Sequence, residues 1–182
     1  ARRRVGVVGL GTASMAAYAK PGQAWTFYEI NPVVERLARD PQFFTYLRDC
    51  APDARVVIGD ARLMLAREPD GAFDVLVLDA FSSDAIPVHL MTLEAIDLYF
   101  RKLAPGGVLA LHISNRFLRL TPVVSAVARQ AGLFGLVQVH LPTAEQRAIS
   151  QEMASSRWAV VARRRADIDA IADDSRWQSL ED

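Results

Sequence analysis

The sequence predicts an α/β fold, with a doubly wound and mostly parallel sheet of seven strands that ends in an antiparallel hairpin. Strand-like and helix-like runs alternate along most of the chain, and such alternation builds right-handed crossovers between parallel strands. The run at 73–79, FDVLVLD, is apolar along nearly its whole length, as expected of a central strand that helices cover on both faces. No helix-like run separates the last two strands, at 136–140 and 158–162, so these two can pair antiparallel.

Proline and glycine divide the first half of the chain into elements. Pro21 stops the first helix and Pro32 follows the second strand, because proline cannot continue regular structure freely and restricts the residue before it. Phe43 and Leu47 suit one buried helical face, and Cys50 on the same helix is expected in the core. The expected elements are a strand at 5–8, a helix at 13–20, a strand at 25–30, helices at 33–39 and 42–50, a strand at 55–58, a helix at 61–67 and the strand at 73–79.

The second half of the chain carries capping signals. Thr92 can cap a helix, and Gly132 stands just past the C-terminus of the next one. The expected elements are a helix at 92–103, a strand at 108–113, a helix at 122–131, and the two terminal strands. We therefore expect one domain at 1–165, followed at 166–182 by a helical tail that docks on the body through Trp177.

The composition is that of one globular domain with no nucleic-acid partner. The chain has 182 residues, enough for one well-packed core, and its 21 Lys and Arg balance its 21 Asp and Glu. Phosphate binding would favour a basic excess, which is absent. No apolar run approaches the roughly 18 residues that span a bilayer, so we expect no membrane contact by this segment. A cytoplasmic location, as a separate protein or as the cytoplasmic domain of a larger one, fits these features.

Cysteine and histidine give no reason to expect a metal. Cys50 is the only cysteine, which excludes an intramolecular disulfide and a cysteine-based zinc site. His89, His112 and His140 lack the spacing of a metal site. His112 follows the fifth strand and could line a pocket, but we interpret it as a structural histidine.

The ends of four successive strands carry residues suited to an adenosine-containing ligand. Ligands of open α/β sheets bind at the carboxyl ends of the strands. Gly9 and Gly11 follow the first strand, Glu29 the second, Asp60 the third and Asp79 the fourth. Glycines let the backbone approach a ligand, and carboxylates can accept ribose hydroxyls or the adenine amino group. Each residue alone also suits a turn or a helix cap, but the combination predicts an adenosine-containing cofactor.

The residues leave the identity of that cofactor open. The dinucleotide fingerprint Gly-x-Gly-x-x-Gly or Ala has Ser14 at its last position here. The antiparallel hairpin and the sequence Gly59-Asp60-Ala61 indicate S-adenosylmethionine or its decarboxylated form rather than NAD.

The segment from Phe73 to Leu90, FDVLVLDAFSSDAIPVHL, resembles the active-site segment of the spermidine synthase family. The resemblance is strongest to a bacterial spermidine synthase-like group, some of whose members are fused to transporter-like membrane segments. It covers about residues 4–163 and includes GLGT at 9–12, YEINP at 28–32, GDAR at 59–62, DAFSSD at 79–84 and HISNR at 112–116.

The resemblance implies a transferase with a Rossmann-like methyltransferase fold. Such an enzyme moves an aminopropyl group from decarboxylated S-adenosylmethionine to a small polyamine substrate, with no metal. By this resemblance Glu29 binds ribose, Asp60 binds the adenine amino group, and Asp79 contacts the cofactor and accepts a proton, while Asp84 holds the cationic substrate. Further cofactor contacts are expected at Gly9, Gly11, Thr12, Ile30 and Ala61. The chemistry agrees, because a polyamine nitrogen must lose a proton before it attacks carbon.

Three departures keep other functions open. Thr12 stands where spermidine synthases usually have an Asp, which leaves S-adenosylmethionine and methyl transfer possible. The spacing from Asp79 to Asp84 is longer than in the family. Relatives have a β-rich domain before the first strand, where this chain begins, so we expect either a fragment or a substrate side built differently. A non-catalytic cofactor-binding domain therefore stays open, as does a homodimer.

Overall fold

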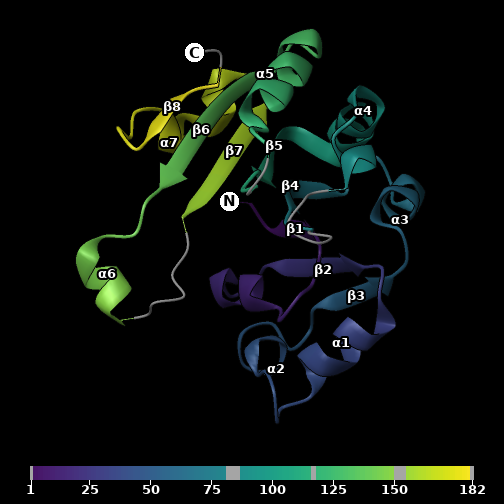
Figure 1. The fold of residues 1–182 in the computed structure, drawn as a ribbon. Helices are drawn as coiled ribbons and strands as arrows, with labels where there is room; N and C mark the ends of the chain where they lie inside the picture. The colour runs from purple at the N-terminus through teal and green to yellow at the C-terminus, as the bar shows by residue number, and fades with distance from the viewer. Residues whose placement is uncertain (1, 81–86, 116–117, 150–154, 181–182) are drawn as a thin grey trace.

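A computed structural model describes residues 2–80, 87–115, 118–149 and 155–180 of the chain (Figure 1). Within them, eight strands form one sheet in the order β3-β2-β1-β4-β5-β7-β6-β8. The five strands from β3 to β5 are parallel, and the pairs β5–β7, β7–β6 and β6–β8 are antiparallel. The strands are β1 (Arg4–Val8), β2 (Ala24–Glu29), β3 (Arg55–Ile58), β4 (Phe73–Leu78), β5 (Leu103–His112), β6 (Phe134–His140), β7 (Ser156–Ala162) and β8 (Trp177–Ser179).

Helix starts follow the capping residues of the sequence. The side chains of Asn31, Asp60 and Thr92 accept hydrogen bonds from backbone N–H groups in the first turns of α1, α3 and α4. The α-helices are α1 (Pro32–Arg39), α2 (Tyr46–Cys50), α3 (Ala61–Arg67), α4 (Leu93–Lys102), α5 (Thr121–Gln130), α6 (Ala144–Ile149) and α7 (Asp169–Ala172). Short 3₁₀ helices are η1 (Ser14–Tyr18), η2 (Val88–Leu90) and η3 (Arg165–Ile168). No helix in the described parts of the chain is long and apolar enough to cross a membrane.

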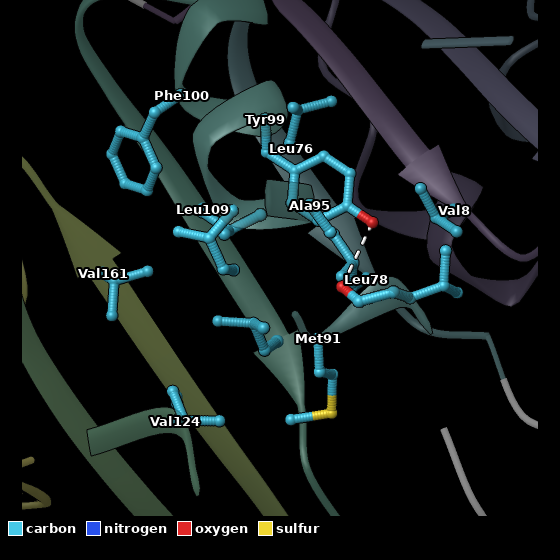
Figure 2. Packing of buried hydrophobic residues seen from close by; sticks show 14 of the residues in the cluster. Val8, Leu76, Leu78, Met91, Ala95, Tyr99, Phe100, Leu109, Val124 and Val161 are labelled. Atoms are coloured by element: carbon cyan, nitrogen blue, oxygen red, sulfur yellow. Dashed lines mark hydrogen bonds between the residues drawn. The ribbon is translucent and has the colours of Figure 1, made fainter. Parts of the chain in front are cut away.

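The core has two layers because alternate residues of each strand point to opposite faces of the sheet. Val8 and Leu78 pack with α3, α4 and α5 on one face, and Val7 and Val77 pack with η1, α1 and α2 on the other. Figure 2 shows the first layer, in which the Tyr99 hydroxyl donates a hydrogen bond to the carbonyl oxygen of Leu90 at 3.1 Å. Burial raises the pKa of Tyr99, and this bond ties η2 to α4.

The helix expected at 42–50 is shorter in the structure, where α2 spans only Tyr46–Cys50. Fewer of its side chains are buried than expected. Gln42 N–H donates to the Asp40 side chain and Phe43 N–H to the Asp40 carbonyl oxygen, which makes a turn in place of helix. Phe43 is 60% exposed. Cys50 is also exposed, so its expected place in the core was wrong. Leu47 alone of this set is fully buried against η1 and the sheet.

Two differences concern the second half of the sheet. β5 begins at Leu103 rather than at 108, because the chain stays paired with β4 through a bulge whose register shifts from Phe73↔Leu103 to Val75↔Val108. The segment 166–182, expected to be helical, contains α7 and then strand β8. In the part of the chain that the structure describes, the sheet therefore has eight strands rather than the predicted seven. Leu180, just past β8, is buried over Gly135 of β6, where an added Cβ would lie 2.6 Å from the Leu180 side chain.

Candidate active site

The carboxyl ends of β1, β2 and β4 meet at the point where the strand order reverses. β1 lies between β2 and β4, so the crossovers leave it in opposite directions and open a crevice there. Two hydrogen bonds join the strand ends: Asp79 N–H donates to the Val8 carbonyl oxygen at 2.8 Å, and Gly9 N–H donates to the Tyr28 carbonyl oxygen at 2.9 Å. The loops after the three strands are thereby held close together.

Gly9 is required at this crossing. Its φ is +95°, and a Cβ on it would lie 2.4 Å from the Asp79 carbonyl oxygen. Such a distance is far below van der Waals contact, so any larger residue would push the loop after β1 away from the loop after β4. Gly11 has φ +51°, but an added Cβ there would meet nothing within 4 Å. Gly11 is thus favoured by backbone conformation alone.

A cleft of about 720 Å³ opens over these strand ends, a size typical of small-molecule sites. Of the predicted site residues, it is lined by Gly9, Gly11, Glu29, Ile30, Asp60, Ala61 and Asp79. Thr12 is exposed and does not line it. Asp84 lies outside the described residues. Pro87, Val88, His89 and Leu90 of the η2 region form a wall that sequence analysis did not assign.

The Glu29 carboxylate is buried and held by the backbone on both sides. Its Oε2 accepts the Leu10 N–H at 3.1 Å, and its Oε1 accepts the Asn31 N–H at 2.9 Å. An ionised carboxylate offers about four acceptor positions, so two remain after these bonds. Glu29 can therefore be fixed in orientation and still accept hydroxyl groups from a ligand.

One carboxylate oxygen of Asp60 caps a helix and the other lies near a histidine of the cleft wall. Its Oδ1 accepts the Leu63 N–H at 3.0 Å and caps α3. Its Oδ2 lies 3.4 Å from His89 Nε2 of η2. The helix-cap interpretation and the ligand interpretation are thus compatible, because each uses a different oxygen.

Asp79 pairs with a histidine on the neighbouring strand. Asp79 Oδ1 and His112 Nδ1 lie 2.7 Å apart, and His112 Nε2 lies 2.7 Å from Ser114 Oγ. Sequence analysis gave His112 a structural role and missed this pair. The available signal was its position, because Leu78 pairs with Leu111 in the parallel register, and the next residues on the two strands are Asp79 and His112.

The described part of the cleft wall is acidic. Its carboxylates are Glu29, Asp60 and Asp79, and its described lining residues include no Lys or Arg. A wall with three carboxylates and no Lys or Arg of its own attracts cationic ligands. Among the described residues, no group of three or more His, Cys, Asp or Glu side chains is arranged to hold a metal ion. The arrangement suits an adenosine compound with a positively charged tail.

Comparison with known sequences gives one curated relative. No family model matches the chain. Over 119 residues, 63% of this chain, the sequence is 34% identical to the polyamine aminopropyltransferase of Vibrio vulnificus (strain CMCP6). The match covers 38% of that protein, so this chain spans well under half of its relative's length.

Solved structures share the fold at lower identity. A spermidine synthase in complex with the transition state analogue AdoDATO superposes with a TM-score of 0.66 at 17% identity, covering 92% of this chain and 57% of that one. A SAM-dependent methyltransferase from Archaeoglobus fulgidus superposes with a TM-score of 0.58 at 15% identity, covering 88% of this chain and 85% of that one. These likenesses show an α/β methyltransferase-type fold. The chain is thus similar in sequence to a polyamine aminopropyltransferase and in fold to spermidine synthases and methyltransferases.

Proposed function

We propose that the protein transfers an aminopropyl group from decarboxylated S-adenosylmethionine to an amine of a small polyamine, with Asp79 as the proton acceptor. The observation that carries this proposal is the acidic cleft at the switch point, with Asp79 on its wall beside Glu29 and Asp60. The sequence similarity to a polyamine aminopropyltransferase supports the same reaction class. The acceptor amine is the small-molecule partner that this chemistry requires.

The donor would lie across the strand ends with its adenosine toward β2 and β3. Glu29 would accept the ribose hydroxyls, and Asp60 Oδ2 would accept the adenine amino group, while Ile30 and Ala61 line the adenosine end. Gly9 and Gly11 would let the backbone approach the sulfonium side. These placements match the lining of the cleft, in which all six residues take part.

The charge of the cleft favours the decarboxylated donor. Decarboxylated S-adenosylmethionine carries a sulfonium and an ammonium group, whereas S-adenosylmethionine carries a carboxylate in addition. The described wall offers three carboxylates and no Lys or Arg to pair with that extra anion. Thr12, which stands where spermidine synthases usually have an Asp, does not line the cleft, so this difference removes no carboxylate from the cleft wall.

In the proposed reaction, the lone pair of the acceptor nitrogen attacks the aminopropyl carbon attached to sulfur. The C–S bond breaks, its electrons neutralise the sulfonium, and methylthioadenosine leaves. Because an amine with an ordinary pKa of about 10.4 is protonated at neutral pH, the acceptor must pass one proton to Asp79 before the attack, which frees its lone pair; the carboxylate also orients the nitrogen. The new C–N bond returns a positive charge to the nitrogen, and the product leaves as an ammonium ion.

The test uses the full-length protein. Aminopropyl transfer is measured with decarboxylated S-adenosylmethionine and a panel of aliphatic di- and triamines, and donor affinity is measured by calorimetry. Asp79→Asn is expected to lower kcat by about 10²- to 10⁴-fold, the usual contribution of a general base, while the donor Kd stays within about tenfold. Asp97→Asn, on the exposed face of α4, is the matched control. Normal turnover by Asp79→Asn would contradict its role as proton acceptor.

Methyl transfer is the second candidate, favoured by the likeness to the Archaeoglobus fulgidus methyltransferase over 85% of that chain. The two reactions release different products, methylthioadenosine from aminopropyl transfer and S-adenosylhomocysteine from methyl transfer. Tight binding of the decarboxylated donor alone would exclude methyl transfer. If neither donor nor methylthioadenosine bound, both transfer reactions would be excluded and a non-catalytic domain would remain.

A further inference from the structure

Three polar side chains beside the cleft form a continuous chain of hydrogen bonds. Asp79 follows β4, His112 ends β5, and Ser114 lies two residues further on. The distances are 2.7 Å from Asp79 Oδ1 to His112 Nδ1 and 2.7 Å from His112 Nε2 to Ser114 Oγ. The Asp79 and His112 side chains keep 26% and 21% of their surfaces exposed, so the pair lies at the edge of the cleft rather than within the core.

The partners of this chain determine where the histidine proton lies. Ser114 Oγ accepts the Arg157 N–H at 2.8 Å, which leaves its own O–H free to donate to His112 Nε2. The Asp79 carboxylate can only accept, so His112 Nδ1 must carry the proton that joins them. The neutral imidazole is therefore held in the Nδ1–H form.

A stacked indole ring fixes the plane of this imidazole. His112 pairs with Trp158 across β5 and β7, and their rings lie 4.5 Å apart between centroids with an interplanar angle of 5°. Rotation of His112 about its Cβ–Cγ bond would break the stacking and both hydrogen bonds together. The ring is thus held by its edge and by its face.

We infer that His112 is a positioning residue for Asp79, an inference that rests on the proposed function. By donating to Oδ1, His112 fixes the carboxylate and leaves Oδ2 for the proton of the acceptor amine. The Asp–His–Ser connectivity is also that of a hydrolase triad. Ser114, however, does not line the cleft and its oxygen is already held by Arg157 N–H, so it orients the imidazole and is no nucleophile.

Three substitutions at His112 separate hydrogen bonding from packing. In His112→Asn the amide nitrogen can take the place of Nδ1 and still donate to Asp79. In His112→Gln the amide reaches the place of Nε2 and loses that bond, and His112→Phe keeps the stacked ring but neither hydrogen bond. His140→Gln, at the exposed end of β6, is the control. All are made in the full-length protein, with aminopropyl transfer and calorimetric donor binding as readouts.

His112→Gln and His112→Phe are expected to lower kcat by about 10- to 100-fold, the range typical of losing a partner that orients a functional side chain. The donor Kd should stay within about threefold, since His112 does not line the cleft. His112→Asn should recover most of the lost kcat, and Ser114→Ala should fall between wild type and His112→Phe. Equal kcat values for the Asn, Gln and Phe variants, with wild type active, would overturn the inference.

Nitrogen NMR of the imidazole distinguishes failure of this inference from failure of the proposed function. The structure requires an Nδ1–H signal for His112 in the wild type, whether or not the protein transfers an aminopropyl group. An Nε2–H form in the wild type would overturn the positioning role, even if transfer were observed. Absence of transfer by a wild type that shows the Nδ1–H form would overturn the proposed function alone.

Discussion

Replacing Gly9 with alanine tests whether contact between the loops after β1 and β4 builds the cleft. The new Cβ would start 2.4 Å from the Asp79 carbonyl oxygen, so one loop must retreat by about 1 Å to restore an ordinary contact distance. Gly11→Ala is a matched control in the same loop, because its φ is also positive but its Cβ would meet nothing within 4 Å. Both variants place alanine at a positive φ, and only Gly9→Ala adds a clash.

The conformational cost of alanine at positive φ is about 1–2 kcal/mol. For a domain of this size, 1 kcal/mol lowers Tm by about 2–4 °C, so Gly11→Ala should lose about 2–8 °C. Gly9→Ala adds the clash, which for an overpacked site costs about 1–3 kcal/mol more, and should lose about 2–12 °C beyond the control.

The assay is thermal unfolding of both variants in the full-length protein, followed by calorimetry with decarboxylated S-adenosylmethionine. We expect Gly9→Ala to weaken donor binding more than Gly11→Ala, because its clash moves Asp79 relative to Glu29. Equal Tm values and equal donor affinities for the two variants would refute the reasoning, since they would show that the crossing tolerates a side chain.

Two further predictions concern stability. Arg4, which donates to the Asp74 side chain, and the N–H groups of Arg3 and Arg4 lower the pKa of Asp74 to about 2. The stability that this lowered pKa contributes is present above the ordinary value of 3.8 and is lost as pH falls through about 2. The Tm difference between wild type and Asp74→Asn should therefore reach its full size at pH 6 and shrink between about pH 4 and 2. A Tm difference that stays constant over this range would contradict the prediction. Leu180→Ala should lower the free energy of unfolding by about 2–5 kcal/mol, because the Leu180 side chain is only 2% exposed. The control Leu141→Ala, at a residue that is 67% exposed, should lower it by less than about 0.5 kcal/mol. Similar losses of Tm for the two variants in thermal unfolding would show that β8 does not dock as described.

Local signals accounted for most of the elements and for the acidic cleft. β3 and α3 have the predicted bounds, because a β-rich run and an Asp60 cap are properties of neighbouring residues. The meeting of Glu29 and Asp79 also followed from the sequence, since carboxyl ends of parallel strands lie at one edge of a sheet. The binding roles of these residues stay predictions until the donor is tested.

Features that depend on contacts distant in sequence were missed or wrongly predicted. Cys50 looked like a core residue by helical spacing, but it ends the short helix α2 with its side chain exposed, and only Leu47 of that helix is buried. β8 has only three residues, and its pairing with β6 depends on Leu180 packing over Gly135. A three-residue run carries too little periodicity to be recognised as a strand.

The sequence by itself determined the α/β alternation, the glycine turn after β1 and the carboxylates at the strand ends, because each is set by residues close together in the chain. Only the tertiary structure decided that His112 faces Asp79 and that Thr12 stays outside the cleft. The first depends on the register between β4 and β5, and the second on the path of the turn between β1 and η1. Neither register nor direction is encoded in local spacing, because both arise from packing between segments far apart in sequence.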